Sequence, residues 1–401
     1  MNIATATIAL SIVIMLCSNA LINGFKSEIS DKIFGFWGHI HITDTKVLRT
    51  SESVPIEMDK ELEKAIGELN QVSFVDQYTQ SKKTTNGGVT HIQPYTFVPG
   101  LLDNNKSWEG IILKGIDRNF NWKQMSHYLL EGKPIEFSDT IASRDLIISA
   151  QTASRMQVKV GDALIVHFGK ERKSVKKRFK VSAIYKTELE EYDSKFAFCD
   201  LKLTQEILEW SPNQITGYEV YLEDLQDASY FADIIYNDYL PRGLYTETIQ
   251  EKLPNIFEWL ELQNINETII IFLMVIVSII NMATVILIFI LDRSRMIGIL
   301  KSVGSRDWMI RKIFIMQAFW ILFKGIIIGN IIALALILLQ RYGQIIRLDP
   351  DSYYVSIAPV IISIYPFIWI NTLVILVTLL WMILPTYIIT KIRPVKVLRF
   401  G

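Results

Sequence analysis

The sequence predicts an α-helical membrane protein with four transmembrane helices and one large α+β domain outside the bilayer. Three stretches carry no charged side chain at all: residues 1–25, 268–291 and 352–390. A fourth stretch, 313–340, is interrupted only by Lys324. Each stretch can supply the roughly 20 apolar residues that a membrane-spanning helix needs. Because the long polar region 26–267 separates the first stretch from the other three, one span precedes the large domain and three follow it.

The placement of charge predicts the orientation of these spans. Residues 24–262 hold 28 basic and 36 acidic side chains, whereas the rest of the chain holds 13 basic and 5 acidic ones. Basic residues gather between the second and third spans and in the tail after the last span: Arg293, Arg295, Lys301, Arg306, Arg311, Lys312, Lys391, Arg393, Lys396 and Arg399. Positively charged loops tend to stay in the cytoplasm. The large domain is therefore expected on the opposite side of the membrane.

These patterns divide the chain into eight expected segments. In chain order they are transmembrane helix 1 (1–25), an extracytoplasmic domain (26–264), transmembrane helix 2 (265–292), a cytoplasmic segment (293–312), transmembrane helix 3 (313–340), an extracytoplasmic loop (341–363), transmembrane helix 4 (364–390) and a cytoplasmic tail (391–401). No Lys or Arg precedes Lys26, and no small-residue cleavage pattern precedes Cys17. We therefore expect the first stretch to be retained as a span rather than cleaved as a signal peptide.

The large domain has the pattern of a mixed α and β fold. Alternating, β-branched and aromatic residues predict strands at 162–168, 179–185, 195–198 and 218–222. Helical spacing of apolar residues predicts helices at 55–69, 149–156, 203–210 and 228–239. The region is long enough to bury a core of its own, in one body or in two subdomains.

The chain lacks the common sequence signatures of catalysis and of metal binding. The pairs Gly132-Lys133 and Gly169-Lys170 lack the upstream glycine of a phosphate-binding loop, and neither H-E-x-x-H nor G-x-S-x-G occurs. His39 and His41 alternate in an expected strand without a third ligand nearby, so a structural role is favoured over metal binding. Cys17 lies in a span, so it cannot form an extracytoplasmic disulfide with Cys199. We expect no catalytic residue, no bound metal or cofactor and no nucleic-acid partner.

The connection 293–312 has the pattern of a short amphipathic helix. Its apolar stripe consists of Met296, Ile299, Leu300 and Val303, and basic residues are expected elsewhere on its surface: Arg293, Arg295 and Lys301. Gly304 can end this helix in a left-handed conformation, and Ser305 can cap the next helix, with Asp307 in its first turn. Such a helix either lies among lipid headgroups or inserts as a rigid lever into a groove on a soluble partner.

A few polar residues stand out inside the expected spans. Lys324 either lines a cavity that cargo passes, or it reaches the membrane surface or pairs with another residue. Gly325 and Gly329 are spaced so that a neighbouring helix can approach closely, which suits a packed dimer. Asn281 and Asn371 are expected to form hydrogen bonds between helices.

Several motifs, in a fixed order, resemble those of FtsX-type ABC transporter permeases. The run 293–307 is similar to their R-x-R-x-I-G-I-L-K-x-x-G-x-x-x segment, and 348–356 (L-D-P-x-x-Y-Y-V-S), Pro385 and 394–400 (P-V-x-x-L-R-F) follow in order. Residues 23–40 and the Val160-Gly161-Asp162 turn after Ile148 resemble the extracytoplasmic domain of these permeases. Within this superfamily, the combination is most similar to the lipoprotein-releasing permeases of the LolC/LolE type.

The resemblance implies a MacB-like or type VII ABC exporter permease in the bacterial inner membrane, with its large domain in the periplasm. It implies a separate ABC ATPase, through which ATP and Mg act, and a second permease copy, identical or paralogous. It further implies mechanotransmission, a lipoprotein cargo, a periplasmic lipoprotein chaperone and contact with membrane lipid. The residues implied to couple to the ATPase are Arg293, Arg295, Met296, Ile299, Leu300, Lys301, Val303 and Gly304.

The chain departs from the family pattern at two places. Family members usually carry a basic amphipathic segment before the first span, and this sequence shows none. The hairpin that recruits the chaperone in LolC-type members contains proline, whereas the corresponding stretch 168–179 has none. That stretch is either a solvated hairpin tip or an electrostatic dock for an acidic partner or lipid headgroups, through its basic residues Lys170, Arg172, Lys173, Lys176, Lys177 and Arg178. Alternative functions within the fold are a peptide or drug efflux permease and a cell-division regulator of the FtsX type.

Overall fold

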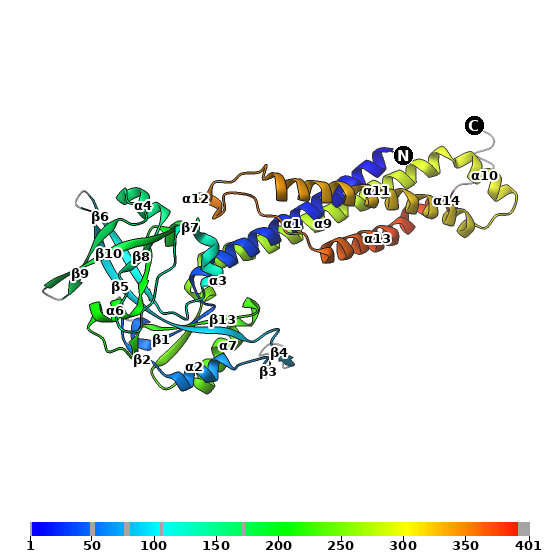
Figure 1. Cartoon of the computed structure of the whole chain (residues 1–401). Coiled ribbons are helices and arrows are strands. Elements are labelled where there is room, and N and C mark those ends of the chain that lie inside the picture. Colours follow the sequence, from blue (N-terminus) through cyan, green and yellow to red (C-terminus); the bar gives the residue numbers. More distant parts are fainter. Residues whose placement is uncertain (1, 49–52, 76–80, 105–106, 171–172, 392–401) are drawn as a thin grey trace. The chain divides into compact units, whose positions relative to one another are not determined.

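A computed structural model describes residues 2–48, 53–75, 81–104, 107–170 and 173–391 (Figure 1). The chain forms two compact units. One unit, here called the membrane unit, consists of Met1–Glu28, Glu258–Leu348 and Val355–Gly401. The other, here called the large domain, consists of Ile29–Phe257 and Asp349–Tyr354. The tail expected at 391–401, apart from the backbone of Lys391, lies outside the described residues.

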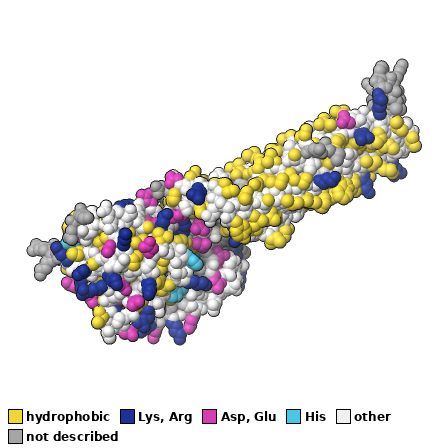
Figure 2. Space-filling view, turned by 45° about the horizontal axis from the view of Figure 1, so that its top comes forward, with side chains coloured by type: hydrophobic (Ala, Val, Ile, Leu, Met, Phe, Trp, Pro, Cys, Tyr) yellow, Lys and Arg dark blue, Asp and Glu magenta, His cyan; other side chains and the backbone are white. Residues whose placement is uncertain are grey.

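Four long helices of the described chain are apolar enough to cross a membrane. They are α1 (Asn2–Phe36), α9 (Pro254–Asp292), α11 (Asp307–Gly343) and α13 (Ile364–Thr386), with the short α14 (Ile388–Lys391) after the last. The four predicted spans are confirmed. The helices α1, α9 and α11 are longer than the predicted apolar stretches, since polar residues next to each stretch are helical as well. Figure 2 shows many hydrophobic side chains on the face of these helices that is in view.

Two of the features that hold the helices of the membrane unit together involve residues of α11. A Cβ atom added at Gly325 would lie 2.8 Å from Cβ of Ile8, and one added at Gly329 would lie 2.8 Å from Cβ of Ile12. The predicted close approach therefore occurs, and the neighbouring helix is the chain's own α1. The second feature is a reciprocal amide pair between α11 and α13, in which Asn330 donates to Asn371 at 3.0 Å and accepts from it at 2.9 Å. The interhelical hydrogen bond expected of Asn371 is confirmed.

The large domain is built on a ten-stranded sheet. Its strands are β1 (Ile40–Asp44), β5 (Val89–Asp103), β6 (Trp108–Ile116), β7 (Leu129–Gly132), β8 (Asp145–Ser149), β9 (Ala163–Lys170), β10 (Lys173–Tyr185), β11 (Phe196–Asp200), β13 (Gly217–Leu222) and β14 (Leu244–Thr248). The strand order is β14-β1-β13-β5-β6-β11-β8-β10-β7, and β9 pairs with both β10 and β5. Six strands therefore close into a ring, β5-β6-β11-β8-β10-β9. Two small sheets pair β2 (Ile56–Glu57) with β12 (Gln214–Ile215) and β3 (Ser73–Val75) with β4 (Lys82–Thr84).

The closed ring and the open part of the sheet each have a separate hydrophobic core. The ring buries side chains such as Leu102, Leu113 and Val166. The open part, β14-β1-β13 with the first half of β5, packs against α2 (Lys60–Gly67) and α7 (Ala228–Ile234) through residues such as Ile66 and Phe231. The large domain thus has two subdomains that share the long strand β5.

Short helices lie in the connections. They are α3 (Trp122–Met125), α4 (Ala150–Met156), α5 (Glu190–Asp193), α6 (Leu201–Leu208), α8 (Ile249–Lys252) and α12 (Pro350–Tyr353). Three of them, α4, α6 and α8, begin at a polar capping residue. The predicted strands and the helices at 149–156, 203–210 and 228–239 are confirmed, although β10 begins at Lys173, before the strand predicted at 179–185. The helix at 228–239 ends as a π-helical turn, Ile235–Tyr239. The helix predicted at 55–69 is shorter, because Asp59 caps its first turn and β2 precedes it.

A buried histidine predicts how the stability of the large domain depends on pH. His39 stacks on Phe34 with the ring centroids 4.0 Å apart, and its Nδ1 accepts a hydrogen bond from the Leu222 N–H at 3.2 Å. Burial lowers the pKa of His39 from 6.5 to about 4, although Asp224 partly opposes this shift. As the pH falls from 6.5 to 4, the unfolded chain binds a proton at this site and the folded chain does not. The folded state therefore loses stability over this window, by about 1.4 kcal/mol per pH unit from this group.

We expect acid to destabilise the wild-type protein more than the His39→Asn variant, in which Asn retains an acceptor close to the position of Nδ1. Urea unfolding of the detergent-purified protein at pH 7 and pH 5, followed by tryptophan fluorescence, measures the two losses. His41 has a lowered pKa as well, because of burial and then because of Lys252 and Lys114, so the variant retains some pH dependence. Equal losses in the two proteins would show that His39 does not contribute.

Candidate functional site

The turn between α9 and α11 is the first candidate site, and its backbone geometry is tightly defined. The short helix α10 (Ser294–Ser302) follows α9. Just after the end of α10, Gly304 has a backbone φ angle of +91°. The Gly304 N–H donates to the Lys301 carbonyl at 3.1 Å, and the Ser305 N–H donates to the Leu300 carbonyl at 3.0 Å. This double hydrogen bond is a Schellman ending, which requires a positive φ and therefore favours glycine. The predicted helix stop at Gly304 is confirmed.

The predicted start of the next helix is wrong by one residue. The N-cap of α11 is Arg306, whose side chain makes no capping hydrogen bond, and Asp307 is the first helical residue. Ser305 belongs to the end of α10 instead, where its N–H donates to the Leu300 carbonyl. Asp307 does lie in the first turn, as expected, where a carboxylate interacts favourably with the helix dipole.

The outer surface of this turn carries exposed apolar side chains among exposed basic ones. Val303 is 80% exposed and Ile299 is 52% exposed, and Met296 is exposed beside them. Two more apolar side chains, just after this turn at the start of α11, are exposed and were missed from the sequence: Trp308 and Met309, which are 61% and 59% exposed. Arg293 and Arg295 are exposed as well. We call these seven residues the α10 surface.

Two of the predicted coupling residues face the membrane unit instead. Leu300 is half-buried against the apolar core of the helices, next to the buried Ile297. Lys301 was expected on the surface, but its side chain is only 11% exposed. Its Nζ lies 2.9 Å from a carboxylate oxygen of Asp307 and donates to the Ile389 carbonyl at 2.6 Å. Lys301 therefore ties α10 to the start of α11 and to α14.

Lys324 lies in a groove between α1 and α11. The groove has a volume of about 580 Å³, and its lining consists of Thr5, Met309, Lys312, Ile313, Met316, Gln317, Trp320, Ile321 and Lys324. Lys324 is exposed on the surface of the membrane unit rather than buried between its helices. A cation is thus available to a molecule that enters this mostly apolar groove.

The basic hairpin is formed by β9 and β10, which pair antiparallel with Lys170 opposite Lys173. Arg172 lies outside the described residues, and for Lys170 and Lys173 only the backbone is described. Lys176 and Arg178 are exposed, whereas Lys177, which points to the other face of the strand, is half-buried and lies 3.3 Å from a carboxylate oxygen of Glu206. The described basic side chains therefore do not form a single patch, because successive residues of a strand face opposite sides.

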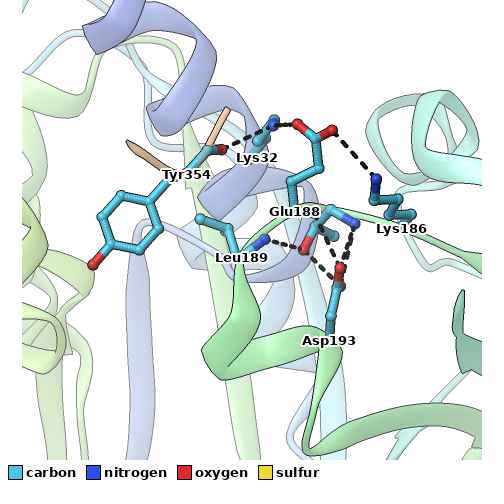
Figure 3. Close-up of polar contacts among 7 residues, drawn as sticks. Lys32, Lys186, Glu188, Leu189, Asp193 and Tyr354 are labelled. Atoms are coloured by element: carbon cyan, nitrogen blue, oxygen red, sulfur yellow. Dashed lines mark hydrogen bonds and ion pairs between the residues drawn. The ribbon is translucent and has the colours of Figure 1, made fainter. Parts of the chain in front are cut away.

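A second candidate site joins three segments of the large domain around Lys32 (Figure 3). Lys32 is near the end of α1, and its side chain is 4% exposed. Its Nζ donates to Glu188 Oε2 at 2.7 Å and to the carbonyl oxygen of Tyr354 at 3.1 Å. Lys186 approaches the other oxygen of the Glu188 carboxylate at 3.6 Å. Lys32 and Tyr354 belong to two motifs that carry the family resemblance, but the sequence alone assigned them no role.

The loop that carries Glu188 is held by a buried carboxylate. Asp193 accepts hydrogen bonds from the Thr187 hydroxyl at 2.8 Å and from the Glu188 N–H at 3.0 Å. Burial raises the pKa of Asp193, and the hydrogen bonds from Thr187 and Glu188 act in the opposite direction. This loop therefore presents Glu188 to Lys32 from a fixed backbone.

Comparison with known proteins agrees with this architecture. Residues 2–234 match the MacB-like periplasmic core domain, and residues 268–394 match the FtsX-like permease C-terminal domain. The lipoprotein-releasing system transmembrane protein LolE of Haemophilus influenzae is 23% identical, over 98% of this chain and 92% of that protein. LolC of the same organism is 21% identical, over 100% of this chain and 93% of that protein. LolC of Buchnera aphidicola subsp. Schizaphis graminum is 23% identical, over 94% of this chain and 88% of that protein.

The first of these family matches covers more than half of the chain, and the two matches together account for both compact units. The four apolar helices and the α+β domain are the parts that such a permease requires. The chain therefore belongs to the FtsX-like permeases with a MacB-like periplasmic core domain, and it is an ABC transporter permease of the LolC/LolE type, a multi-pass protein of the bacterial inner membrane with its large domain in the periplasm.

Proposed function

We propose that this chain is the permease subunit of an ABC transporter that extracts lipoproteins from the inner membrane by mechanotransmission. The observation that carries the proposal is the α10 surface, an exposed apolar and basic face on a rigid turn of the membrane unit. Two helices, α1 and α9, each contain residues of both units, so the chain has continuous helical connections along which movement can pass. The similarity to LolC and LolE over nearly the whole chain supports lipoproteins as the cargo.

Extraction of a lipid anchor needs an external source of energy. Each methylene group that leaves the bilayer costs about 0.8 kcal/mol, so a lipoprotein with two or three acyl chains does not leave spontaneously on a useful timescale. The sequence carries no phosphate-binding loop of its own. We therefore assign ATP hydrolysis, with Mg, to a separate ATPase subunit, and we expect a second permease copy in the complex, identical or paralogous.

The α10 surface is the proposed contact with this ATPase. Trp308 and Met309 add an aromatic and a flexible apolar side chain to Met296, Ile299 and Val303. Met is enriched at protein interfaces, and Trp often dominates their binding energy. Lys301 has a different role in this proposal, because its ammonium holds the turn rigid from within. A helix with the same composition can also lie among lipid headgroups, and the following experiment separates the two cases.

Replacing Ile299 and Val303 by Asp should leave the protein inserted in the membrane but abolish co-purification of the ATPase. Loss of two apolar anchors at about 2 kcal/mol each weakens binding by roughly a thousandfold. Affinity purification from membranes and the ATPase activity of the purified complex measure the effect. Ile141→Asp, which makes the same change at a more exposed isoleucine of the large domain, serves as the control. An unchanged amount of bound ATPase in the double variant would mean that α10 contacts lipid instead.

The exposed basic residues of the β9–β10 hairpin are the proposed contact with the periplasmic chaperone. Lys176 and Arg178 share one face of β10, where they can attract an acidic partner at long range. The Lys176→Gln/Arg178→Gln variant should load less lipoprotein onto the chaperone while its ATPase activity persists, and the defect should shrink as salt is added. Lys60→Gln/Lys64→Gln removes the same charge from α2 as a control. Equal chaperone loading by the two variants would rule out the hairpin as the contact.

The cargo itself is tested in cells. Depletion of this permease should leave mature outer-membrane lipoproteins in the inner membrane, because no other step supplies the extraction work. Separation of the two membranes on a density gradient, followed by detection of lipoproteins in each fraction, measures their distribution. Normal sorting after depletion would argue against lipoprotein release and for a role in peptide or drug efflux or in cell division.

A further inference from the structure

The chain passes between its two compact units four times, not twice. Besides the passages in α1 and α9, Leu348 belongs to the membrane unit, Asp349–Tyr354 to the large domain, and Val355 again to the membrane unit. The connection between α11 and α13 therefore contributes a short piece, which contains α12, to the large domain. A segment that only joined two membrane helices would not need to be part of that domain.

A nearly buried ammonium holds this piece in the large domain. Lys32 Nζ donates to the Tyr354 carbonyl at 3.1 Å and to the Glu188 carboxylate at 2.7 Å, and the side chain of Glu188 is 17% exposed (Figure 3). Removal of one partner from a buried charge leaves that charge poorly compensated. Release of Asp349–Tyr354 would therefore take an acceptor away from Lys32.

The two residues that accept hydrogen bonds from Lys32 both have an uncommon backbone conformation. Glu188 has φ +64° and Tyr354 has φ +60°, and neither is glycine. Residues other than glycine keep such values only where surrounding contacts hold them, and these values often occur at parts of proteins that change conformation. The contact that holds the backbone of Glu188 comes from Asp193. The strained residue Tyr354 is contacted directly by Lys32.

We propose that Lys32 is a latch that locks the connection between α11 and α13 onto the large domain. It makes the large domain move together with this connection when ATP is bound and hydrolysed, so that opening the latch uncouples ATP hydrolysis from cargo release. The locking itself follows from the contacts of Lys32, and the coupling rests on the function proposed above. Lys32 is thus a positioning residue, which acts through the segment that it holds.

The first test measures the lock without reference to cargo. Hydrogen exchange of the full-length protein in detergent reports on the amides of Ser352, Tyr353 and Tyr354, which are hydrogen-bonded to Asp349 or Pro350. Lys32→Met should raise their exchange rates at least tenfold, Glu188→Gln should raise them less, and Lys32→Arg should restore protection. Lys26→Met removes an ammonium from the same helix, one that donates to Asn264, and should change nothing. Unchanged exchange in Lys32→Met, with wild-type exchange elsewhere in the large domain, would overturn the latch.

The second test measures coupling in the reconstituted complex with its ATPase, in proteoliposomes that contain a triacylated lipoprotein as the probe. Lys32→Met should keep ATPase activity within about twofold of wild type while the lipoprotein released per ATP falls at least tenfold, and Glu188→Gln should show the same split if Lys32→Met does not fold. Normal release per ATP in a variant whose segment 349–354 exchanges fast would overturn the coupling. If the wild-type complex releases no lipoprotein, the proposed function fails, and the exchange data still decide whether Lys32 locks the segment.

Discussion

A lysine ammonium that joins a carboxylate to a distant backbone carbonyl is the interaction on which this structure depends. At Lys114 the partners are Glu219 and the carbonyl of Phe36, both at 2.6 Å. At Lys32 and at Lys301 the same arrangement recurs with other partners. Lys114 is fully buried among aromatic rings, with the Trp37 ring centroid 4.7 Å from its Nζ, and burial lowers its pKa although Glu219 opposes the shift. An ammonium in such a place is tolerated only if both acceptors stay in position.

Because Phe36 is the last residue of α1, the Lys114 contact fixes the end of that helix inside the large domain. A cation is also favourable there, since the carboxyl end of a helix carries partial negative charge. In the membrane unit, Lys301 does the equivalent for the short helices near the α10 surface. Charge therefore fastens the end of α1 and the junction of α10, α11 and α14, while apolar packing and the Asn330–Asn371 pair hold the membrane helices along their length.

The sequence was sufficient to predict the four spans, the mixed domain and the helix stop at Gly304, because each depends on a local pattern: absence of charge, alternation, or a residue that tolerates positive φ. It was not sufficient for Lys301, because periodicity places a residue on one side of a helix without showing which neighbour covers that side. Trp308 and Met309 were missed because they belong to the next helix and join the α10 surface only after the turn at Gly304. The Lys32 contacts join residues that are 156 and 322 positions apart, a separation that no local pattern spans.

The place of Asp349–Tyr354 in the large domain has a consequence for the order in which the protein is made. Lys32 and Glu188 leave the ribosome long before Tyr354, which follows Lys32 by 322 residues. The newly translocated domain therefore has to wait, with Lys32 lacking one acceptor, until α11 has been inserted with its far end on the periplasmic side. Only a chain whose third span is inserted in the correct direction can complete this contact. Completion of the Lys32 contacts thus depends on correct membrane insertion of α11.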